Sequence, residues 1–283
     1  MLNLKVLVLT LFRLNIINFM KGRARLMLGR ASLAQILLHP HDPTFIPNSA
    51  NSWPQSLQDP TKYYKNCVRY FYQAAPEYLV DHRRYFSQES RGFGEAAFHV
   101  MWAALFSIFK PSSFLEIGVY RGQTLSLASL CSREICFPTL VCGISPFTSA
   151  ADSVSKYSNQ INYYEDTLKN FAFFQLPAPH LVRGLSTEPH VWKQVSQHKW
   201  DMVYIDGNHD YEVAKSDFTN CNQILAPRGL IVLDDSGLFT RYKAPLFSTA
   251  GHFGPSKLAG EISALGFQEL LQVGHNRVFQ KNT

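Results

Sequence analysis

The fold of this chain is decided by residues 113–127, SFLEIGVYRGQTLSL. The stretch begins with a short apolar run, interrupted only by Glu116, as expected of a strand buried in a parallel sheet. Gly118 and Gly122 then bound a turn, and an apolar helical pattern begins at Thr124. Glycine allows positive φ and a close approach of the backbone to a ligand. A strand, a glycine turn and a helix N-terminus together form the ligand crevice of an open α/β sheet.

The residues of this turn favour a cationic ligand over a dinucleotide. The dinucleotide fingerprint is G-x-G-x-x-G, whereas Tyr120 stands here in place of a second close glycine and would obstruct a pyrophosphate. The carboxylate of Glu116 would repel one as well. The spacing resembles the first motif of class I S-adenosylmethionine-dependent methyltransferases, whose cofactor carries a sulfonium and an ammonium. A tight turn that binds no ligand is the alternative interpretation.

Composition and charge limit the class of protein. The chain has 283 residues, of which 46% are hydrophobic and 17% charged, as in ordinary globular proteins. Six of its 27 basic residues precede Asp42, the first acidic residue, and the remaining 21 balance the 21 acidic residues. This neutral body excludes a broad nucleic-acid surface, so no nucleic-acid partner is expected. Five cysteines without a C-x-x-C pair predict free thiols in a reducing compartment, and hence a cytoplasmic protein.

Residues 1–47 are predicted as a basic, apolar amino-terminal segment. An uncharged run such as Val6–Phe12 is far shorter than the about 20 residues that span a bilayer. No small-residue cleavage site follows, so a secretory signal fits this segment poorly. Two interpretations stay open. One is an interfacial helix that makes weak contact with a membrane surface through residues 1–30. The other is a true start at Met20 or Met27.

The remaining chain predicts a helical cap followed by an α/β domain. Residues 48–110 are predicted as the cap, with an exposed linker over Asn48–Thr61 and a helix over Phe93–Phe109. Residues 111–283 alternate strand and helix patterns and end in a hairpin, with later strands expected at Thr139–Ile144, near Leu181, at Trp200–Asp206, at Leu230–Asp235 and over Gly266–Gln280. The predicted fold is Rossmann-like α/β, with a seven-stranded, mostly parallel sheet, an antiparallel C-terminal hairpin and a helical N-terminal extension.

Carboxylates follow two neighbouring strands of this predicted sheet. Asp206 ends one strand, and Asp234 and Asp235 end the next, so all three should meet at one edge. Their mutual repulsion would be relieved by Mg²⁺, which prefers oxygen ligands and promotes loss of a proton from a bound hydroxyl. His209 follows Asp206 closely and is the predicted general base, so His209 and Asp206 are the predicted catalytic residues. The alternative interpretation is a helix cap and an exposed loop histidine.

A second resemblance lies in residues 204–214, YIDGNHDYEVA, together with Asp217. They resemble small class I methyltransferases that share an Asp-Gly-x-His-x-Tyr segment, with sugar and antibiotic O-methyltransferases and cephalosporin-hydroxylase-like proteins nearby. The resemblance covers roughly residues 113–280, and members of the wider group differ in whether they need a metal. It implies a metal site at Asp206, Asp234 and Asp235, and cofactor binding at Glu116, Gly118, Tyr120, Gly122, Ser145 and Ser186.

Two of these positions depart from the pattern or carry a second interpretation. An acidic residue usually ends the second strand in such enzymes and holds the ribose hydroxyls, whereas Ser145 stands there in this chain. Asp152 is an alternative ribose ligand. Ser186 lies in the turn that borders the adenine in the family, and it is equally interpreted as a helix cap.

The predicted reaction is methyl transfer from S-adenosylmethionine, assisted by Mg²⁺, to a hydroxyl of a sugar or other small metabolite. The partner is thus a small-molecule or glycan acceptor, and a homo-oligomer is compatible with the sequence. One alternative is a non-catalytic methyltransferase-like interaction module, which Ser145 favours. The other is a nicotinamide-dependent oxidoreductase, which the missing second glycine disfavours. Acceptor specificity is expected in the N-terminal helices and in the lid-like loop Ser236–Pro255.

Overall fold

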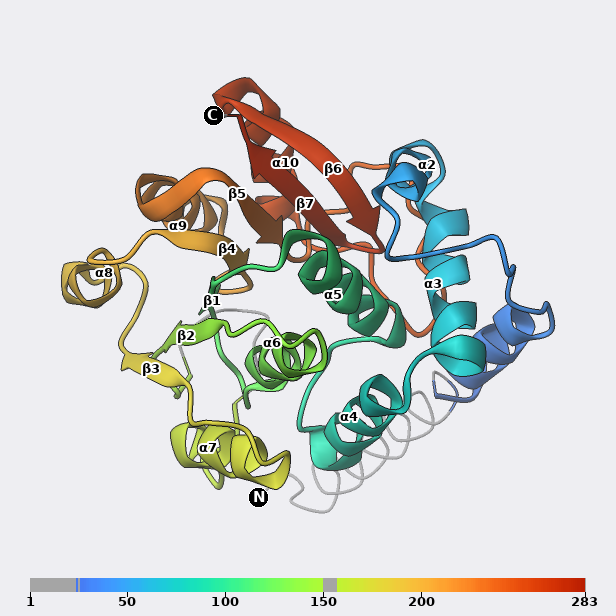
Figure 1. Ribbon diagram of the computed structural model, residues 1–283, viewed down its shortest axis with the longest axis horizontal. Helices are drawn as coiled ribbons and strands as arrows, with labels where there is room; N and C mark the ends of the chain where they lie inside the picture. Colours follow the sequence, from blue (N-terminus) through green and yellow to red (C-terminus); the bar gives the residue numbers. More distant parts are fainter. Residues whose placement is uncertain (1–23, 25, 150–156, 283) are drawn as a thin grey trace, which may run out of the picture.

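A seven-stranded sheet forms the centre of the protein in a computed structural model, which describes residues 24, 26–149 and 157–282 (Figure 1). The strand order is β3-β2-β1-β4-β5-β7-β6. Strand β7 runs antiparallel to both of its neighbours, and the other pairs are parallel. The strands are β1 (Ser113–Ile117), β2 (Leu140–Ser145), β3 (His180–Arg183), β4 (Trp200–Ile205), β5 (Leu225–Leu233), β6 (Phe267–Val273) and β7 (Asn276–Lys281). This confirms the predicted fold class.

Alternating side chains of the central strands fill two separate cores. Phe114 of β1 belongs to the core on one face of the sheet, and its neighbour Leu115 belongs to the core on the other face. This is the period of two that a strand imposes. The Phe114 side is covered by α5 (Ala96–Phe109), α6 (Gln123–Glu134) and α7 (Tyr163–Phe173). The Leu115 side is covered by α8 (Pro189–Val195), α9 (Tyr211–Ile224) and α10 (Phe253–Ile262).

Helices that precede β1 pack on the first of these cores. They are a helix over residues 26–37, α2 (Trp53–Gln58), α3 (Pro60–Ala74) and α4 (Glu77–Ser87), with short 3-10 turns η1 (Ala50–Ser52), η2 (Gln88–Ser90) and, near the C-terminus, η3 (Ser263–Leu265). One core contains Ile36, Val68 and Val278, which come from all three predicted segments. The core thus continues across the predicted borders at residues 47 and 110, and the division into three segments stays a prediction.

The prediction of an exposed linker over Asn48–Thr61 is wrong where η1 and α2 form. Trp53 is 3% exposed, and its ring lies 5.8 Å from that of Phe109. The Ser56 hydroxyl accepts a hydrogen bond from the N–H of Gln272 on β6 at 2.9 Å. The polar composition suggested a loop, whereas burial of one tryptophan and a proline in the first turn of α2 stabilise a helix.

Three further predictions concern the amino-terminal segment, Asp152 and the cysteines. The amino-terminal segment before residue 24 and Asp152 lie outside the described residues. Within the described ranges, no helix is long and apolar enough to cross a bilayer. All five cysteines are free, and four of them are buried whereas Cys136 is exposed.

Candidate active site

The backbone places the predicted carboxylates side by side at one edge of the sheet. The hydrogen-bond ladder extends one residue beyond the strands, because the Asp206 N–H donates to the Ile117 carbonyl at 2.9 Å and the Asp234 N–H donates to the Ile205 carbonyl at 3.0 Å. Strands β1, β4 and β5 therefore end level with one another. This edge lies where the strand order reverses, which is the ligand-binding position of open α/β sheets.

Gly118 lets the turn after β1 approach the end of β4. Its φ is +100°, and a Cβ atom there would lie 1.9 Å from the Asp206 carbonyl oxygen. Any larger residue would push these two turns apart. The glycine thus fixes the spacing between the β1 turn and the carboxylate of Asp206.

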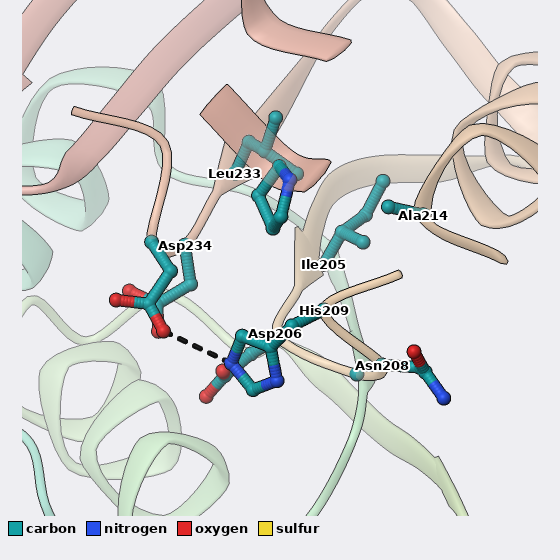
Figure 2. Close-up of a pocket in the computed structure, with 10 residues that line it drawn as sticks. Ile205, Asp206, Asn208, His209, Ala214, Leu233 and Asp234 are labelled. Carbon is teal, nitrogen blue, oxygen red and sulfur yellow. Dashed lines mark hydrogen bonds and ion pairs between the residues drawn. The ribbon is translucent and has the colours of Figure 1, made fainter. Parts of the chain in front are cut away.

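A cavity of about 500 Å³ opens at this edge, within the usual range for small-molecule sites. Figure 2 shows Asp206, His209 and Asp234 close together at the ends of β4 and β5. Seven of the predicted site residues line this cavity: Glu116, Gly118, Tyr120, Asp206, His209, Asp234 and Asp235.

Burial raises the pKa of three of the lining carboxyl groups. Glu116 is 3% exposed, its Oε2 atom has no hydrogen-bond partner among the described residues, and burial raises its pKa to about 8. Burial and the neighbouring charge of Asp234 raise the pKa of Asp206. Burial and the charge of Asp235 likewise raise the pKa of Asp234. A cation in this cavity would stabilise all three carboxylates.

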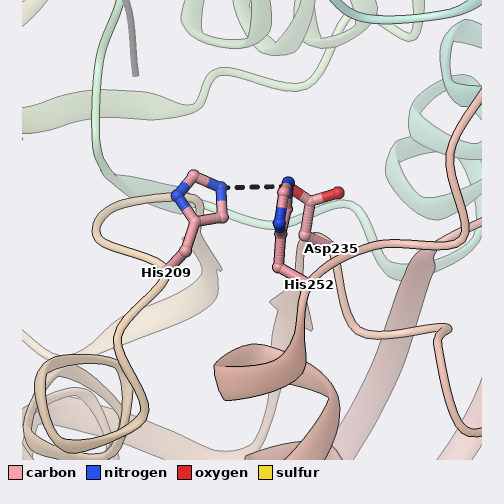
Figure 3. A group of neighbouring side chains, drawn as sticks. All are labelled: His209, Asp235 and His252. Carbon is pink, nitrogen blue, oxygen red and sulfur yellow. Dashed lines mark hydrogen bonds and ion pairs between the residues drawn. The ribbon is translucent and has the colours of Figure 1, made fainter. Parts of the chain in front are cut away.

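Asp235 differs from its neighbours because histidines surround it (Figure 3). Its Oδ2 atom lies 3.0 Å from Nε2 of His209 and 3.5 Å from Nε2 of His252. Burial alone would raise the pKa of Asp235, but the hydrogen bond from His209 and the charge of His275 hold it below its usual value. Asp235 is therefore ionised, and it keeps a proton on Nε2 of His209.

His275 is a site residue that the sequence did not predict. Its Nδ1–H donates to the Thr249 carbonyl at 3.0 Å, and its Nε2 lies 3.5 Å from Oδ1 of Asp234. Burial would lower the pKa of His275, but the carboxylates of Asp234 and Glu95 raise it above its usual value. The residue reaches the site only through the antiparallel pairing of β5 with β7, and no local motif signals that pairing.

Glu95 is a second lining residue that sequence reasoning missed. The Tyr64 hydroxyl donates to its carboxyl group, and burial raises the pKa of Glu95. The preceding segment is held against α6, since the Gly94 N–H donates to Oε1 of Gln123 at 2.8 Å. The sequence shows only a lone glutamate before an apolar helix, so its position depends on how α5 packs.

Three of the predicted cofactor residues do not line this cavity. The Ser145 hydroxyl donates to the Val119 carbonyl at 2.8 Å, and Ser145 is 1% exposed. Ser186 lies before α8, where its carbonyl accepts the Trp192 indole N–H at 2.6 Å. Gly122, with φ +77°, is the N-cap residue of α6. Cofactor binding by these three residues stays a prediction.

The donor atoms at this edge differ from the all-oxygen site predicted for Mg²⁺. In the described part of the chain, two groups of side chains bring ligand atoms within 4.8 Å of one another: His209, Asp235 and His252 form the first, and Asp234, Asp235 and His275 the second. Both groups contain imidazole nitrogen, and neither contains Asp206. Because Mg²⁺ prefers oxygen ligands, these donors do not fit it.

Known proteins share the fold and part of the sequence pattern of this chain. Residues 115–236 match a family model described as a methyltransferase domain. The fold is similar to that of an O-methyltransferase from Bacillus cereus in complex with S-adenosylhomocysteine (SAH), with a TM-score of 0.53 and 13% identity over 83% of this chain and all of the other. Comparison with curated proteins gave no match.

Two further solved structures share the fold. The SAH-bound methyltransferase PaMTH1 from Podospora anserina is 16% identical, with a TM-score of 0.51, over 74% of this chain and 89% of the other. A putative caffeoyl-CoA O-methyltransferase from Staphylococcus aureus is 14% identical, with a TM-score of 0.51, over 72% of this chain and 92% of the other. Residues 115–236 therefore resemble a methyltransferase domain, and the chain has the fold of class I methyltransferases.

Proposed function

We propose that this protein transfers the methyl group of S-adenosylmethionine to a hydroxyl oxygen of a small-molecule acceptor such as a sugar or other metabolite. The observation that carries the proposal is the buried, unpaired Oε2 atom of Glu116, which lines the cavity together with Asp206. The O-methyltransferases that share the fold favour an oxygen acceptor.

The residues present fit the charge of this cofactor. Its ammonium and sulfonium groups are cations, and burial raises the pKa values of the Glu116, Asp206 and Asp234 carboxyl groups. A cation in the cavity would stabilise their ionised forms. The close turn at Gly118 leaves no side chain between the β1 turn and Asp206. Favourable charge pairing in a water-poor cavity is a strong source of affinity.

His209 and Asp235 are the residues we assign to proton transfer. When bound, the cofactor supplies a methyl group on a sulfonium, and the electron pair of the breaking S–C bond stays on sulfur. The acceptor hydroxyl must lose a proton as its oxygen bonds to the methyl carbon. His209 accepts this proton, and the Asp235 carboxylate, 3.0 Å from Nε2 of His209, stabilises the resulting imidazolium.

No step of this proposal uses Mg²⁺. The predicted set of Asp206, Asp234 and Asp235 does not form one group of oxygen ligands, because Asp235 faces His209 and His252. The donor chemistry therefore supports a mechanism in which the histidine–aspartate pair, rather than a magnesium ion, promotes loss of the proton.

Calorimetric titration with SAH tests the proposal directly. We expect saturable binding, weakened about tenfold by Glu116→Gln because a charge-assisted contact is lost. Glu134→Gln, at a half-exposed glutamate on α6, is the control and should leave affinity unchanged. Incubation with S-adenosylmethionine and a panel of hydroxylated acceptors should then form SAH.

A second candidate function is a methyltransferase-like interaction module without catalysis. It is favoured by Ser145, which stands where an acidic ribose ligand is expected. The Ser145 hydroxyl donates a hydrogen bond to the Val119 carbonyl, and Ser145 does not line the cavity. Wild-type protein that binds no SAH would support this candidate and contradict methyl transfer. Asp206→Asn separates the two candidates further. Methyl transfer predicts that this variant loses SAH formation, whereas the interaction module predicts unchanged behaviour.

A further inference from the structure

A second cavity, of about 510 Å³, lies beside the catalytic one. It is bounded by the helix over residues 26–37, by α3, by α4 and by the loop before α10 (Figure 1). The Arg69 side chain of α3 donates to the Ile36 carbonyl at 3.0 Å and so links α3 to the helix over residues 26–37. Phe93, Glu95 and Phe247 line both cavities, which therefore share a wall.

The walls of this second cavity are mainly apolar. Leu33, Val68 and Phe247 contribute to its lining. Four further lining residues are large apolar or aromatic side chains that stay exposed: Leu26, Tyr72, Phe93 and Leu246. Exposed apolar side chains that gather around a cavity indicate a site for an apolar ligand, whereas scattered ones need no explanation.

One guanidinium nitrogen in this apolar cavity makes no hydrogen bond to the described residues. Arg83 of α4 lines the cavity, and its Nη1 atom is buried without a hydrogen-bond partner among the described residues. The adjacent Arg84 is exposed and paired with Asp81 at 2.8 Å. A buried guanidinium nitrogen without an acceptor is unfavourable, and an anionic ligand supplies that acceptor.

The remaining charges in the lining leave the cavity positive. Arg30 adds a second guanidinium. Glu95 is the single acidic residue among the described lining residues, and it makes no ion pair with Arg83. Burial raises the pKa of Glu95, and Tyr64 donates to its carboxyl. An oxyanion thus meets two arginines and a single carboxyl group.

We propose that the second cavity binds the acceptor through an anionic group on Arg83, so that the acceptor is an apolar hydroxy acid. Its apolar body packs between Leu33, Val68 and Phe247, and its hydroxyl end reaches past Glu95 toward the catalytic cavity. That the ligand is the methyl acceptor rests on the proposed function, whereas the anion site itself does not depend on it.

A matched pair of fluorescent probes tests the anion site. 8-Anilinonaphthalene-1-sulfonate carries an anionic group, and N-phenyl-1-naphthylamine has the same aromatic body without it. Arg83→Gln should weaken binding of the sulfonate about tenfold, because one charge-assisted contact is lost. It should leave the neutral probe unchanged. Arg84→Gln, at the neighbouring exposed arginine, should affect neither probe.

Two outcomes would overturn the anion site: an equal loss of both probes in Arg83→Gln, or no change for the sulfonate. If Arg83→Gln fails to fold, Tyr72→Glu gives the same answer from a half-exposed position, since it adds an anion to the lining and should repel only the sulfonate. Displacement of the sulfonate by decanoate but not by decyl phosphate identifies a carboxylate as the anionic group, and the reverse identifies a phosphate. Displacement by decanol equal to that by either acid contradicts the proposal.

The failure of this inference differs from a failure of the proposed function. SAH calorimetry reports on the catalytic cavity, and Arg83→Gln should not alter it. Wild-type protein that binds the sulfonate through Arg83 but no SAH would disprove methyl transfer and keep the anion site. SAH binding without Arg83-dependent probe binding would do the opposite.

Discussion

Nε2 of His209 lies 3.0 Å from Oδ2 of Asp235, which connects the turn after β4 to the carboxyl end of β5. This contact joins the two segments that carry the acidic residues of the site. Because the Asp235 carboxylate is ionised, it orients the imidazole and stabilises its protonated form.

Replacement of Asp235 by Asn should lower kcat about 100-fold or more, since a neutral amide no longer stabilises the imidazolium of His209. SAH should still bind, because Glu116 and Asp206 remain. Initial rates of SAH formation, together with calorimetry, measure both effects. Asp210→Asn, at an exposed residue of the same turn, is the control, and an equal loss of kcat in that variant would contradict the assignment.

Glu116 predicts that affinity for SAH depends on pH. Its pKa of about 8 in the free protein means that it is protonated at neutral pH, while the ionised form binds the ammonium of the ligand. Binding therefore releases a proton, and affinity rises as the pH rises toward 8. Titrations in two buffers of different ionisation enthalpy count the released protons. Glu116→Gln should remove its share of that release, and an unchanged proton count would refute the prediction.

His82 and His99 predict acid lability of the fold. Nδ1 of His82 lies 3.0 Å from Nε2 of His99, and Nε2 of His82 lies 2.9 Å from the Ser126 hydroxyl. Burial lowers the pKa of His99 to about 3 and also lowers that of His82. Because the unfolded histidines, with pKa near 6.5, take up protons first, stability is lost as the pH falls from about 6.5 toward 3.

Thermal unfolding between pH 7 and pH 4 measures this effect. The double variant His82→Gln/His99→Gln keeps hydrogen-bonding groups but cannot titrate, so its Tm should fall less steeply with decreasing pH. His39→Gln, at an exposed histidine, should follow the wild type. Parallel slopes for the wild type and the double variant would show that other groups cause the acid lability.

Gly118 and Gly260 predict opposite effects of the same substitution. Gly118→Ala should destabilise the protein by about 1–3 kcal/mol or more, since φ is +100° and the new Cβ would lie 1.9 Å from the Asp206 carbonyl oxygen. Gly260 lies in α10 with open space around it, so Gly260→Ala should stabilise by about 0.5–1 kcal/mol. Urea denaturation measures both values. A neutral Gly118→Ala variant with intact SAH binding would disprove the close-turn model.

The parts of the fold that sequence predicted are those with strong local patterns. The glycine turn at residues 118–122 and the strands that end at Asp206 and Asp234 each carry their own signal, and their relative positions follow from the rule for parallel sheets. The helix at Trp53 was missed because its stability comes from a contact with Phe109, 56 positions away. Local composition does not report such a contact.

The candidate site divides in the same way. His209 and Asp235 were predicted because each follows a recognisable strand. His275 and Glu95 were not, because their positions depend on the β5–β7 pairing and on the packing of α5. Ser145 shows a third limit, since sequence identifies the hydroxyl but not its hydrogen bond to the Val119 carbonyl.

The two cavities that share a wall are lined by different parts of the sequence. The carboxylates of the catalytic cavity come almost entirely from residues after Ser113, whereas the lining of the neighbouring cavity comes mostly from residues before it. Exchange of residues 26–90 between homologues would thus replace most of the second lining and leave the residues that line the catalytic cavity in place. Substitutions in the lining before Ser113 would therefore change which acceptor binds, in evolution or in protein engineering, while the carboxylates after Ser113 stay unchanged.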